Sequence, residues 1–380
     1  MATVIDITSS PQKLPPSSHR LPTVSASDAF QELQTAGPET ISTTLPALDT
    51  LLTGVGTSSA GGFGRGKTTE IWGPVGAGKT ALLLQIAARE LCRGNTVVWI
   101  DGSSPLVTSR LDSAIEQRTS AMSGVAATQD EMGKYRNNIK HYRVPTLSHL
   151  LAMVLHSQPD FPPSGTTMVV IRGLNTLIDI DYPRILFASA GKSPQQKWQA
   201  GRRYAVLGSL IAGLNKLAIL NNVAIVATTG CASRTRSDSG LGSALVPGIG
   251  GAEWDGGLWN RLVVFRDFHC RFVGLQKSQG RSLIGRQEIG EIGRIVAFDV
   301  EHDGSVRQQG PLSDMPSEGL RKSISRSPAK PRKRYIDEVA DSEGEDADEY
   351  GWAETDEDAL TADTGVEEIA EQTATDGATV

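Results

Sequence analysis

The eight-residue segment from Gly73 to Thr80 constrains the fold of this chain more than any other feature. It reads GPVGAGKT and matches the pattern GxxxxGK[ST] in full. A β-branched run at 69–72 (TEIW) leads into it, and a helix-forming stretch at 79–93 leads out of it. Strand, glycine-rich turn and helix in this order form a cradle in which backbone N–H groups and the helix N-terminus face a phosphate. The segment therefore predicts an α/β nucleotide-binding fold.

The residue types in this segment have expected roles in holding a nucleotide. Lys79 is expected to reach the β- and γ-phosphates, and the Thr80 hydroxyl is expected to hold Mg²⁺. A tight glycine turn that binds no nucleotide is the alternative, and the flanking strand and helix argue against it. The predicted nucleotide-binding residues of the segment are Gly73, Pro74, Val75, Gly76, Ala77, Gly78, Lys79 and Thr80.

Apolar strand-like runs alternate with helical stretches between residues 43 and 310. Buried parallel strands read as continuous hydrophobic runs, and they need helical crossovers. The alternation predicts an α/β class with a mostly parallel sheet over 43–310. The expected strands are 69–72, 97–100, 168–171, 224–227 and 262–265, with 272–276 and 294–300 as further candidates; the expected helices are 79–93, 106–117, 147–156 and 203–220.

The two ends of the chain differ in composition from this central region. Residues 1–42 are rich in Ser, Pro and Thr and are expected to form a flexible arm. Residues 311–380 are expected to be a disordered tail, with a basic cluster followed by an acidic stretch. The segment from Tyr335 to Val380 holds 17 Asp and Glu and no Lys or Arg, which leaves 26 acidic and 37 basic residues in the rest. This split predicts a basic body followed by a solvated acidic tail.

Composition and spacing also exclude several classes of protein. No uncharged apolar run approaches the roughly 18 residues that span a bilayer, so no membrane partner is expected. Cys92, Cys231 and Cys270 have neither CxxC nor Cys/His spacing, which argues against a disulfide scaffold and a zinc site. The basic cluster at 330–334 resembles a nuclear-import signal and predicts a nuclear protein, with a plain surface patch as the alternative.

Several further motifs occur in a fixed order around the glycine-rich segment. They are TTLPALDTLLTGVG at 43–56, WIDGSSPLVTSRL at 99–111, MVVIRGLNTLIDIDY at 168–182, AIVATTG at 224–230, and PGIGG at 247–251 with Arg261 ten residues on. In this order they resemble the RecA/RadA recombinase family in its eukaryotic branch, over about residues 43–303. The chain is most similar to short fungal recombination-mediator subunits. The resemblance implies a RecA-like P-loop core that binds ATP, with the Arg110 guanidinium on the adenine.

Three departures from the family's pattern imply weak or absent hydrolysis. The family has a metal-organising carboxylate at the end of its Walker B strand, and this chain has Arg172 there. The water-activating Glu falls at Ser103, and the sensor Gln falls at Gly230. No catalytic residue is therefore predicted, and whether the chain is an enzyme stays open. The carboxylates that could stand in for the lost one are Asp101, Asp179 and Asp181.

Arg172 itself has two interpretations. It could pair with a γ-phosphate and replace the charge of the metal. Alternatively it reaches the end of the sheet and binds a local carboxylate, which is the interpretation we favour.

Two stretches correspond to the family's DNA-facing loops, 182–203 and 231–251. The first carries basic side chains beside Trp198, and the second carries arginines among Ser and Gly. Basic and aromatic side chains together suit single-stranded DNA, through phosphate neutralisation and base stacking. Basic loops that serve solubility alone are the alternative. The predicted DNA-binding residues are Lys192, Lys197, Arg202, Arg203, Arg234 and Arg236.

The resemblance also implies partners. The family's filaments join through a Phe-x-x-Ala strand, and residues 28–40 lack this motif, so long filaments of this chain alone are not expected. We expect a heterodimer with a second recombinase paralogue that assists assembly of the main recombinase filament on single-stranded DNA, in homologous recombination and double-strand break repair. Two alternatives stay open: an active DNA-dependent ATPase that exchanges strands, and a RecA-fold scaffold that binds no nucleotide.

Overall fold

The computed structural model describes residues 25, 27, 40–53, 61–125, 127–183, 194–235, 243–267, 270–285 and 292–309. The chain divides into two units, Met1–Glu39 and Thr40–Val380. Only Ser25 and Ser27 of the first unit are described, so the fold below is that of the second. Almost all of the predicted arm, the whole predicted tail, and the DNA-binding candidates Lys192 and Arg236 lie outside the described residues.

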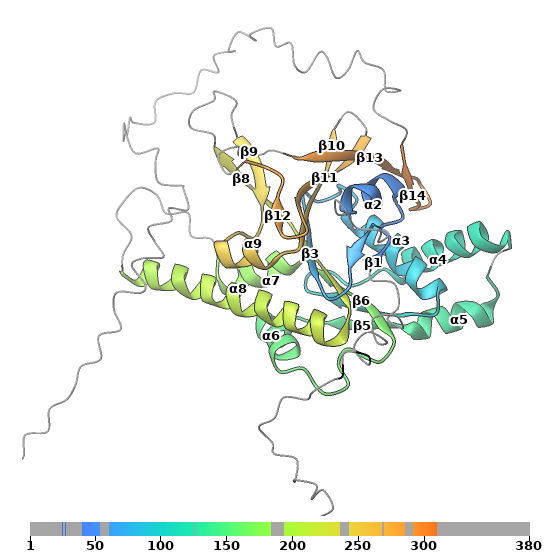
Figure 1. Ribbon diagram of the computed structural model, residues 1–380, viewed down its shortest axis with the longest axis horizontal. Coiled ribbons are helices and arrows are strands. Elements are labelled where there is room, and N and C mark those ends of the chain that lie inside the picture. The colour runs from blue at the N-terminus through green and yellow to red at the C-terminus, as the bar shows by residue number, and fades with distance from the viewer. Residues whose placement is uncertain are drawn as a thin grey trace, which may run out of the picture. The chain divides into compact units, whose positions relative to one another are not determined.

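A central sheet organises the described part of the chain (Figure 1). Its strands are β3 (Thr68–Trp72), β4 (Thr96–Asp101), β5 (Ile139–Arg143), β6 (Thr166–Arg172), β7 (Ala224–Thr229), β10 (Asn260–Asp267), β11 (Cys270–Ser278), β12 (Arg281–Ser282), β13 (Arg294–Val300) and β14 (Val306–Gln308). The strand order is β14-β13-β11-β10-β3-β7-β6-β4-β5, and β12 pairs with β11. The strands from β10 to β5 are all parallel, and β11, β13 and β14 add an antiparallel extension beside β10.

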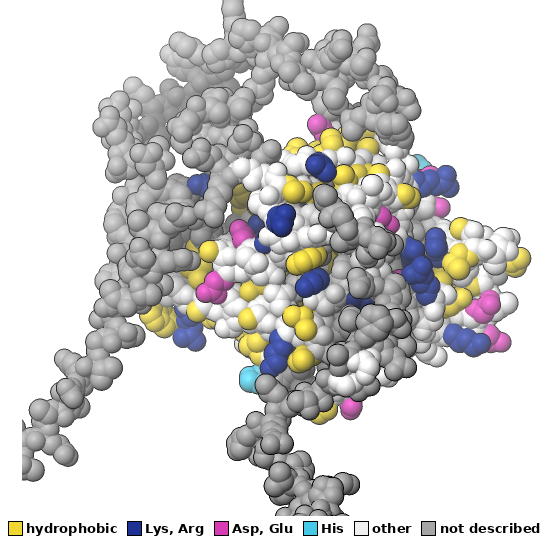
Figure 2. All heavy atoms as spheres, in the orientation of Figure 1, with side chains coloured by type: hydrophobic (Ala, Val, Ile, Leu, Met, Phe, Trp, Pro, Cys, Tyr) yellow, Lys and Arg dark blue, Asp and Glu magenta, His cyan; other side chains and the backbone are white. Residues whose placement is uncertain are grey.

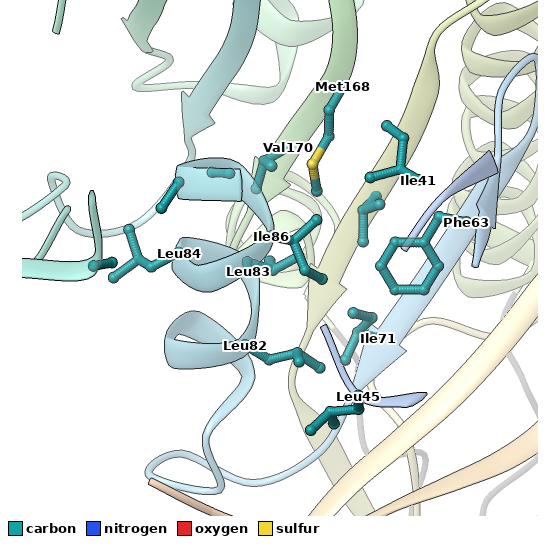
Figure 3. Close-up of a cluster of buried hydrophobic side chains, with 14 of the residues drawn as sticks. Ile41, Leu45, Phe63, Ile71, Leu82, Leu83, Leu84, Ile86, Met168 and Val170 are labelled. Carbon is teal, nitrogen blue, oxygen red and sulfur yellow. The ribbon is translucent and has the colours of Figure 1, made fainter. Parts of the chain in front are cut away.

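Helices pack on both faces of this sheet. They are α2 (Pro46–Leu52), α3 (Lys79–Cys92), α4 (Thr108–Ser123), α5 (Gln129–Asn138), α6 (Leu147–Leu155), α7 (Leu174–Asp181), α8 (Pro194–Asn221) and α9 (Ala252–Gly257). Helices α2 to α5 contribute buried side chains to the core on one face, part of which Figure 3 shows. Helices α6 to α9 contribute to the core on the other face. The predicted α/β class with a mostly parallel sheet is therefore confirmed.

Along each buried strand, successive side chains alternate between the cores on the two faces of the sheet. Met168 and Val170 of β6 enter the core under α3, and Val169 and Ile171 enter the opposite one. Successive side chains of a strand point to opposite faces, so a strand covered on both sides is apolar throughout. For this reason every expected strand lies within an observed one. The arrangement fits the RecA-like core that the resemblance implies.

Two small strand pairs complete the described fold. β1 (Thr40–Ile41) pairs with β2 (Phe63–Gly64), and β8 (Cys231–Thr235) pairs with β9 (Ser243–Pro247) in an antiparallel hairpin. This hairpin forms much of the expected second DNA-facing loop, which is therefore more regular than predicted.

Several elements differ from the sequence prediction. Helix α8 begins at Pro194 rather than 203, so the expected first DNA-facing loop is partly helical. The segments that form β5, α5 and α7 were not among the expected strands and helices. β5 is an edge strand of polar composition (IKHYR) with no buried residue, so it lacks the hydrophobic run that marks its parallel neighbours.

One helix segment, Gly201–Asn221 of α8, is long and apolar enough to cross a membrane by length and composition alone. Its apolar side chains have partners within the protein. Leu207, Leu210, Leu214 and Leu217 are buried in the same core as the strand residues Ile225 and Ala227. The apolar composition of this segment is therefore that of a core helix.

Candidate nucleotide-binding site

The glycine-rich segment forms the turn between the carboxyl end of β3 and the start of α3. Gly73, Gly76 and Gly78 have φ angles of 146°, 80° and 115°. A Cβ on Gly73 would lie 2.0 Å from the carbonyl oxygen of Val264, which leaves no room for a side chain. Glycine is the residue that tolerates both the positive φ and the close approach. The turn that the motif predicts is thus built, and it opens at the amino terminus of α3.

Lys79 folds back over this turn. Its Nζ donates to the carbonyl oxygens of Gly73 at 2.6 Å and Pro74 at 2.8 Å. Burial lowers the pKa of the Lys79 ammonium below its ordinary value of 10.5, and Cys231 opposes this to a smaller extent. A phosphate oxygen is a stronger partner for an ammonium than these neutral carbonyls. The site therefore holds one positive charge that an anion would stabilise.

A cavity of about 440 Å³ lies between α3, α4 and the segment that links β13 to β14. Its walls are Leu84 of α3, Ser109, Arg110, Ser113 and Ala114 of α4, and the residues Val300, Glu301, His302, Asp303 and Gly304 that link β13 to β14. Leu84 is the α3 residue in the cavity wall, and α3 begins directly after the glycine-rich turn. The structure thus brings Arg110 to a cavity along the helix that starts at this turn.

The β13–β14 turn that closes this cavity was not anticipated from the sequence. Gly304 N–H donates to the carbonyl of Glu301 at 2.9 Å, and the Asp303 carboxylate accepts from the Ser305 N–H at 2.9 Å. Hydrogen bonds from Ser305 lower the pKa of Asp303. Gln117 of α4 donates to the Asp303 carbonyl at 3.0 Å, which ties the turn to the helix that carries Arg110. The motif DGS at 303–305, typical of tight turns, is the signal that could have located it.

Arg172 lies at the end of β6, directly opposite Asp101 at the end of the neighbouring strand β4. Its Nε is 3.0 Å from Asp101 Oδ1, and its Nη2 donates to the hydroxyl of Ser104 at 2.5 Å. His141 Nε2 lies 2.8 Å from Asp101 Oδ2, and Trp99 Nε1 donates to Oδ1 at 3.1 Å. The favoured interpretation of Arg172, an ion pair with a local carboxylate, is confirmed.

These contacts also test how well Mg²⁺ fits the site. Asp101 has both oxygens engaged, and its side chain is 1% exposed, so it does not fit the role of a substitute metal ligand. Asp179 pairs with Arg203 at 3.0 Å, and Asp181 is exposed at the end of α7. Within the described residues, no three His, Cys, Asp or Glu side chains form a group that could hold a metal ion. At the end of β6, where the family has a metal-organising carboxylate, Arg172 offers no acceptor to accompany the Thr80 hydroxyl, which is a poor donor set for Mg²⁺.

Ser103 and Gly230 are the other two positions at which the chain departs from the family's pattern, and both contact other residues of the protein. Ser103 packs against Gly173, where a Cβ would lie 2.3 Å from the Ser103 Oγ. Gly230 N–H donates to Asn175 Oδ1 at 2.7 Å, and the Gly230 carbonyl accepts from the Gly248 N–H at 2.9 Å. Neither position offers a carboxylate or an amide side chain that could activate or sense a water.

The predicted DNA-binding residues are distributed differently from the prediction. Trp198 on α8 is 61% exposed, and the Arg202 guanidinium lies over its ring at 5.4 Å. Arg203 turns inward: its Nη2 is 3.0 Å from Asp179 Oδ1, it also donates to the Tyr182 carbonyl, and its side chain is 13% exposed. Arg203 is therefore committed to the protein's own interior contacts rather than to solvent.

The remaining candidates are described in part. Lys197 lies on α8, with its side chain outside the described residues, and Arg234 lies half-buried on β8. Figure 2 shows basic and acidic side chains interspersed on the face it presents, with the largest basic group right of its centre, over α3 and α4. Among the described side chains, the structure therefore brings Trp198 and Arg202 together and places Arg203 against Asp179 instead.

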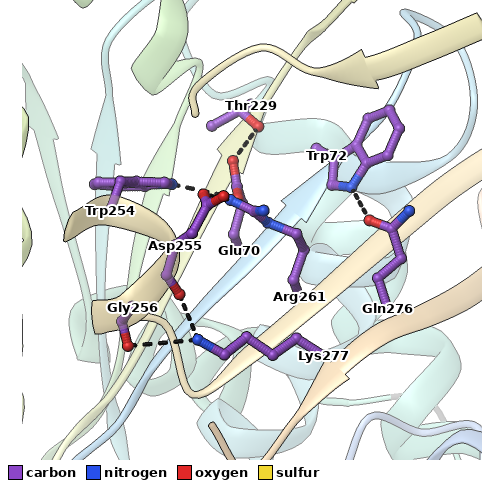
Figure 4. Close-up of polar contacts among 9 residues, drawn as sticks. All are labelled: Glu70, Trp72, Thr229, Trp254, Asp255, Gly256, Arg261, Gln276 and Lys277. Carbon is purple, nitrogen blue, oxygen red and sulfur yellow. Dashed lines mark hydrogen bonds and ion pairs between the residues drawn. The ribbon is translucent and has the colours of Figure 1, made fainter. Parts of the chain in front are cut away.

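A buried polar network links β3, β7, β10 and α9 (Figure 4). Glu70 of β3 is fully buried and accepts from Arg261 Nε at 2.8 Å, Thr229 Oγ1 at 2.7 Å and Trp254 Nε1 at 3.3 Å. A second carboxylate, Asp255, lies 2.5 Å from Arg261 Nη2. A single acidic residue inside an apolar strand run (TEIW) was the available signal for such a network, because a buried charge needs a partner.

The fold and the site together define an α/β protein with a mostly parallel sheet, a glycine-rich turn at the end of β3 and a cavity that contains Arg110, an arrangement that fits a RecA-like core. No protein-family profile matches the chain. The chain is similar to a protein named DNA repair protein rhp55 from the fission yeast Schizosaccharomyces pombe. The two are 24% identical over 250 residues, which cover 54% of this chain and 69% of that protein.

Proposed function

We propose that this chain is a RecA-fold recombinase paralogue that binds ATP and serves DNA repair by homologous recombination. The observation that carries the proposal is the glycine-rich turn with Lys79 folded over it, at the start of the helix α3 that also lines the cavity containing Arg110. The similarity to a protein named for DNA repair supports the process in which it acts. We propose a nuclear location on the same ground, because DNA repair acts on nuclear DNA.

The nucleotide would bind with its phosphates at the turn and its base in the cavity. The phosphates would exchange the carbonyl partners of Lys79 for charged oxygens. Arg110 would lie on the face of the adenine, an arrangement in which a guanidinium attracts a π-system. ATP held in this way acts as a structural ligand: a hundredfold excess over Kd adds about 2.7 kcal/mol to the stability of the folded state.

Hydrolysis would be weak or absent. Arg172 holds the position of a metal-organising carboxylate, and its guanidinium is paired with Asp101. Ser103 and Gly230 lack the groups that would activate or sense an attacking water. A protein with this site would keep its nucleotide bound for long periods rather than cycle between states.

The proposed partners follow from the same comparison. We propose a heterodimer with a second recombinase paralogue, which helps to assemble the main recombinase filament on single-stranded DNA. Trp198 and Arg202 are the described residues that best suit contact with DNA, because an exposed ring stacks on bases and a guanidinium neutralises phosphate. Burial of Arg203 removes it from the proposed contact surface.

Paired measurements of ATP binding and ATP turnover on the purified chain, with and without single-stranded DNA, test the proposal. Lys79→Ala is the control for specific binding. We expect binding without turnover, and loss of binding in the variant. Turnover that DNA stimulates and the variant abolishes would instead favour an active DNA-dependent ATPase. No binding that depends on Lys79 would leave the scaffold that takes no nucleotide.

A further inference from the structure

We infer that the glycine-rich turn binds a nucleoside triphosphate without the help of a divalent cation, with Lys79 and Arg271 supplying the positive charge. This inference rests on the proposed ATP binding and concerns what accompanies the nucleotide. The glycine-rich motif predicts that Mg²⁺ accompanies the nucleotide. The inference differs because Arg172 and Asp101 occupy the ends of β6 and β4.

A magnesium ion in a nucleotide site needs oxygen ligands in near-octahedral geometry. These are commonly phosphate oxygens, a Ser or Thr hydroxyl of the loop, and a carboxylate at the end of a nearby strand, with waters completing the set. Here Thr80 offers the hydroxyl, but the strand end offers Arg172. A guanidinium has five donors and no acceptor, so it cannot take part in the ligand set.

Asp101, at the end of the neighbouring strand β4, is an alternative carboxylate, but its oxygens already have partners. Asp101 is 1% exposed, and each of its oxygens has partners, Arg172 and Trp99 at Oδ1 and His141 at Oδ2. To bind a cation it would have to give up the Arg172 ion pair, and the cation would then lie beside a fixed positive charge. Both changes are unfavourable in a buried site, where charges are weakly screened.

The protein provides positive charge at the turn by other means. Besides Lys79, the side chain of Arg271 on β11 approaches the last residue of the turn, with its Cδ 3.2 Å from where a Cβ of Gly78 would be. Its Nη1 lies 2.8 Å from Asp299 Oδ1. Its Nε is buried, and it has no hydrogen-bond partner among the described residues. A buried donor without a partner calls for an acceptor, and an anion in the turn would supply one.

The geometry therefore assigns Arg271 as a second cationic residue of the turn. Its aliphatic chain packs on Gly78, while the guanidinium is held at one end by Asp299. Lys79 and Arg271, which also contacts Asp299, would then place positive charge beside the phosphates without a divalent cation.

The test is a comparison of ATP affinity in Mg²⁺ and in excess EDTA, by calorimetric titration of the full chain. The variants are Lys79→Ala, Arg271→Gln and, as a matched control, Arg294→Gln, an exposed arginine on the same sheet. We expect the wild-type Kd in EDTA to lie within about threefold of the value in Mg²⁺. Arg271→Gln should weaken binding about tenfold in EDTA, and Arg294→Gln should not change it.

The outcomes separate this inference from the proposed function. Binding that depends on Lys79 but is at least about tenfold tighter in Mg²⁺ would overturn the inference and leave ATP binding intact. Absence of Lys79-dependent binding in both buffers would overturn both.

A second measurement needs no variant. Titration of Mn²⁺ into ATP alone and into the protein–ATP complex, followed by electron paramagnetic resonance, shows whether protein groups ligate the cation. Equal Mn²⁺ affinity in the two samples supports the inference, and clearly tighter binding in the complex contradicts it.

Discussion

Glu70 and Arg261 face each other in register on the adjacent parallel strands β3 and β10, and Arg261 Nε lies 2.8 Å from Glu70 Oε2. Burial alone would lower the pKa of Arg261, but the Glu70 and Asp255 carboxylates outweigh it and raise that pKa above its ordinary value. Arg261 thus stays charged inside the protein, where its charge depends on these carboxylates. The Glu70–Arg261 pair joins the strand that leads into the glycine-rich turn to the strand beside it.

Removing one member of this pair should destabilise the fold strongly. In Glu70→Gln, Arg261 remains buried and loses its main counter-charge. We expect a loss of about 3–5 kcal/mol in the free energy of unfolding, measured by urea denaturation. The control is Asp112→Asn, which breaks the more exposed Arg136–Asp112 pair and should cost no more than about 1 kcal/mol. Equal losses of unfolding free energy in the two variants would show that the buried Glu70–Arg261 pair stabilises the fold no more than the exposed pair does.

ATP affinity should fall as the pH rises through the lowered pKa of Lys79. Bound phosphates raise the pKa of the ammonium, since an anion favours its charged form. Between the pKa of the empty site and that of the occupied site, binding takes up a proton. In that window Kd should rise by up to about tenfold per pH unit, and below it Lys79 should contribute no pH dependence.

The matched variant for this experiment is Lys79→Arg. A guanidinium stays charged over the whole range, so the pH dependence attributed to Lys79 should disappear even if the affinity itself is lower. Titrations of wild type and variant at several values between about pH 7 and pH 10 would check this. Parallel pH curves for the two proteins would assign the effect to another group.

Arg110→Ala should weaken the binding of ATP but not that of inorganic triphosphate. The Arg110 side chain on α4 lines the cavity in which the base is proposed to lie. The turn that would hold the phosphates precedes the neighbouring helix, α3. Loss of a cation–π contact of about 0.5–2 kcal/mol corresponds to a roughly 2- to 30-fold rise in Kd for ATP. Competition titrations with both ligands would measure it. Equal weakening of the two would place Arg110 at the phosphates instead.

Two neighbouring residues of α8 should behave differently toward single-stranded DNA. Trp198→Ala should weaken DNA binding by about 1–3 kcal/mol, because an exposed ring that stacks on a base is lost. Arg203→Gln should leave DNA affinity unchanged and lower the stability of the fold, because Asp179 and the Tyr182 carbonyl lose their partner. Fluorescence anisotropy at several salt concentrations, combined with thermal denaturation, separates the two effects. A DNA defect in Arg203→Gln at unchanged stability would contradict the inward placement of this side chain.

Much of the fold could be predicted because its signals are local. The positive φ angles at Gly73, Gly76 and Gly78 depend on the absence of a side chain, which the residue type alone reports. Strands β6 and β7 are buried on both faces and therefore read as unbroken apolar runs. The edge strand β5 carries no such run, which is why its segment was not among the expected strands.

The candidate site could be predicted only in part. The turn and Lys79 followed from the motif, but the part of the cavity formed at 300–304 comes from a chain segment about 190 residues from Arg110. Arg203 was counted among DNA-binding residues because it is basic and stands in a basic stretch. Its partner Asp179, 24 residues earlier, could not be recognised without knowing how α7 and α8 pack.

The sequence by itself determined the α/β class, the mostly parallel sheet and the position of the glycine-rich turn, because burial pattern and backbone conformation are properties of contiguous residues. Only the tertiary structure decided that Arg172 pairs with Asp101 and that Arg271 approaches Gly78. Those contacts depend on which strands become neighbours and in what register. Hydrogen bonding across the sheet sets this order, and it joins residues that are far apart along the chain.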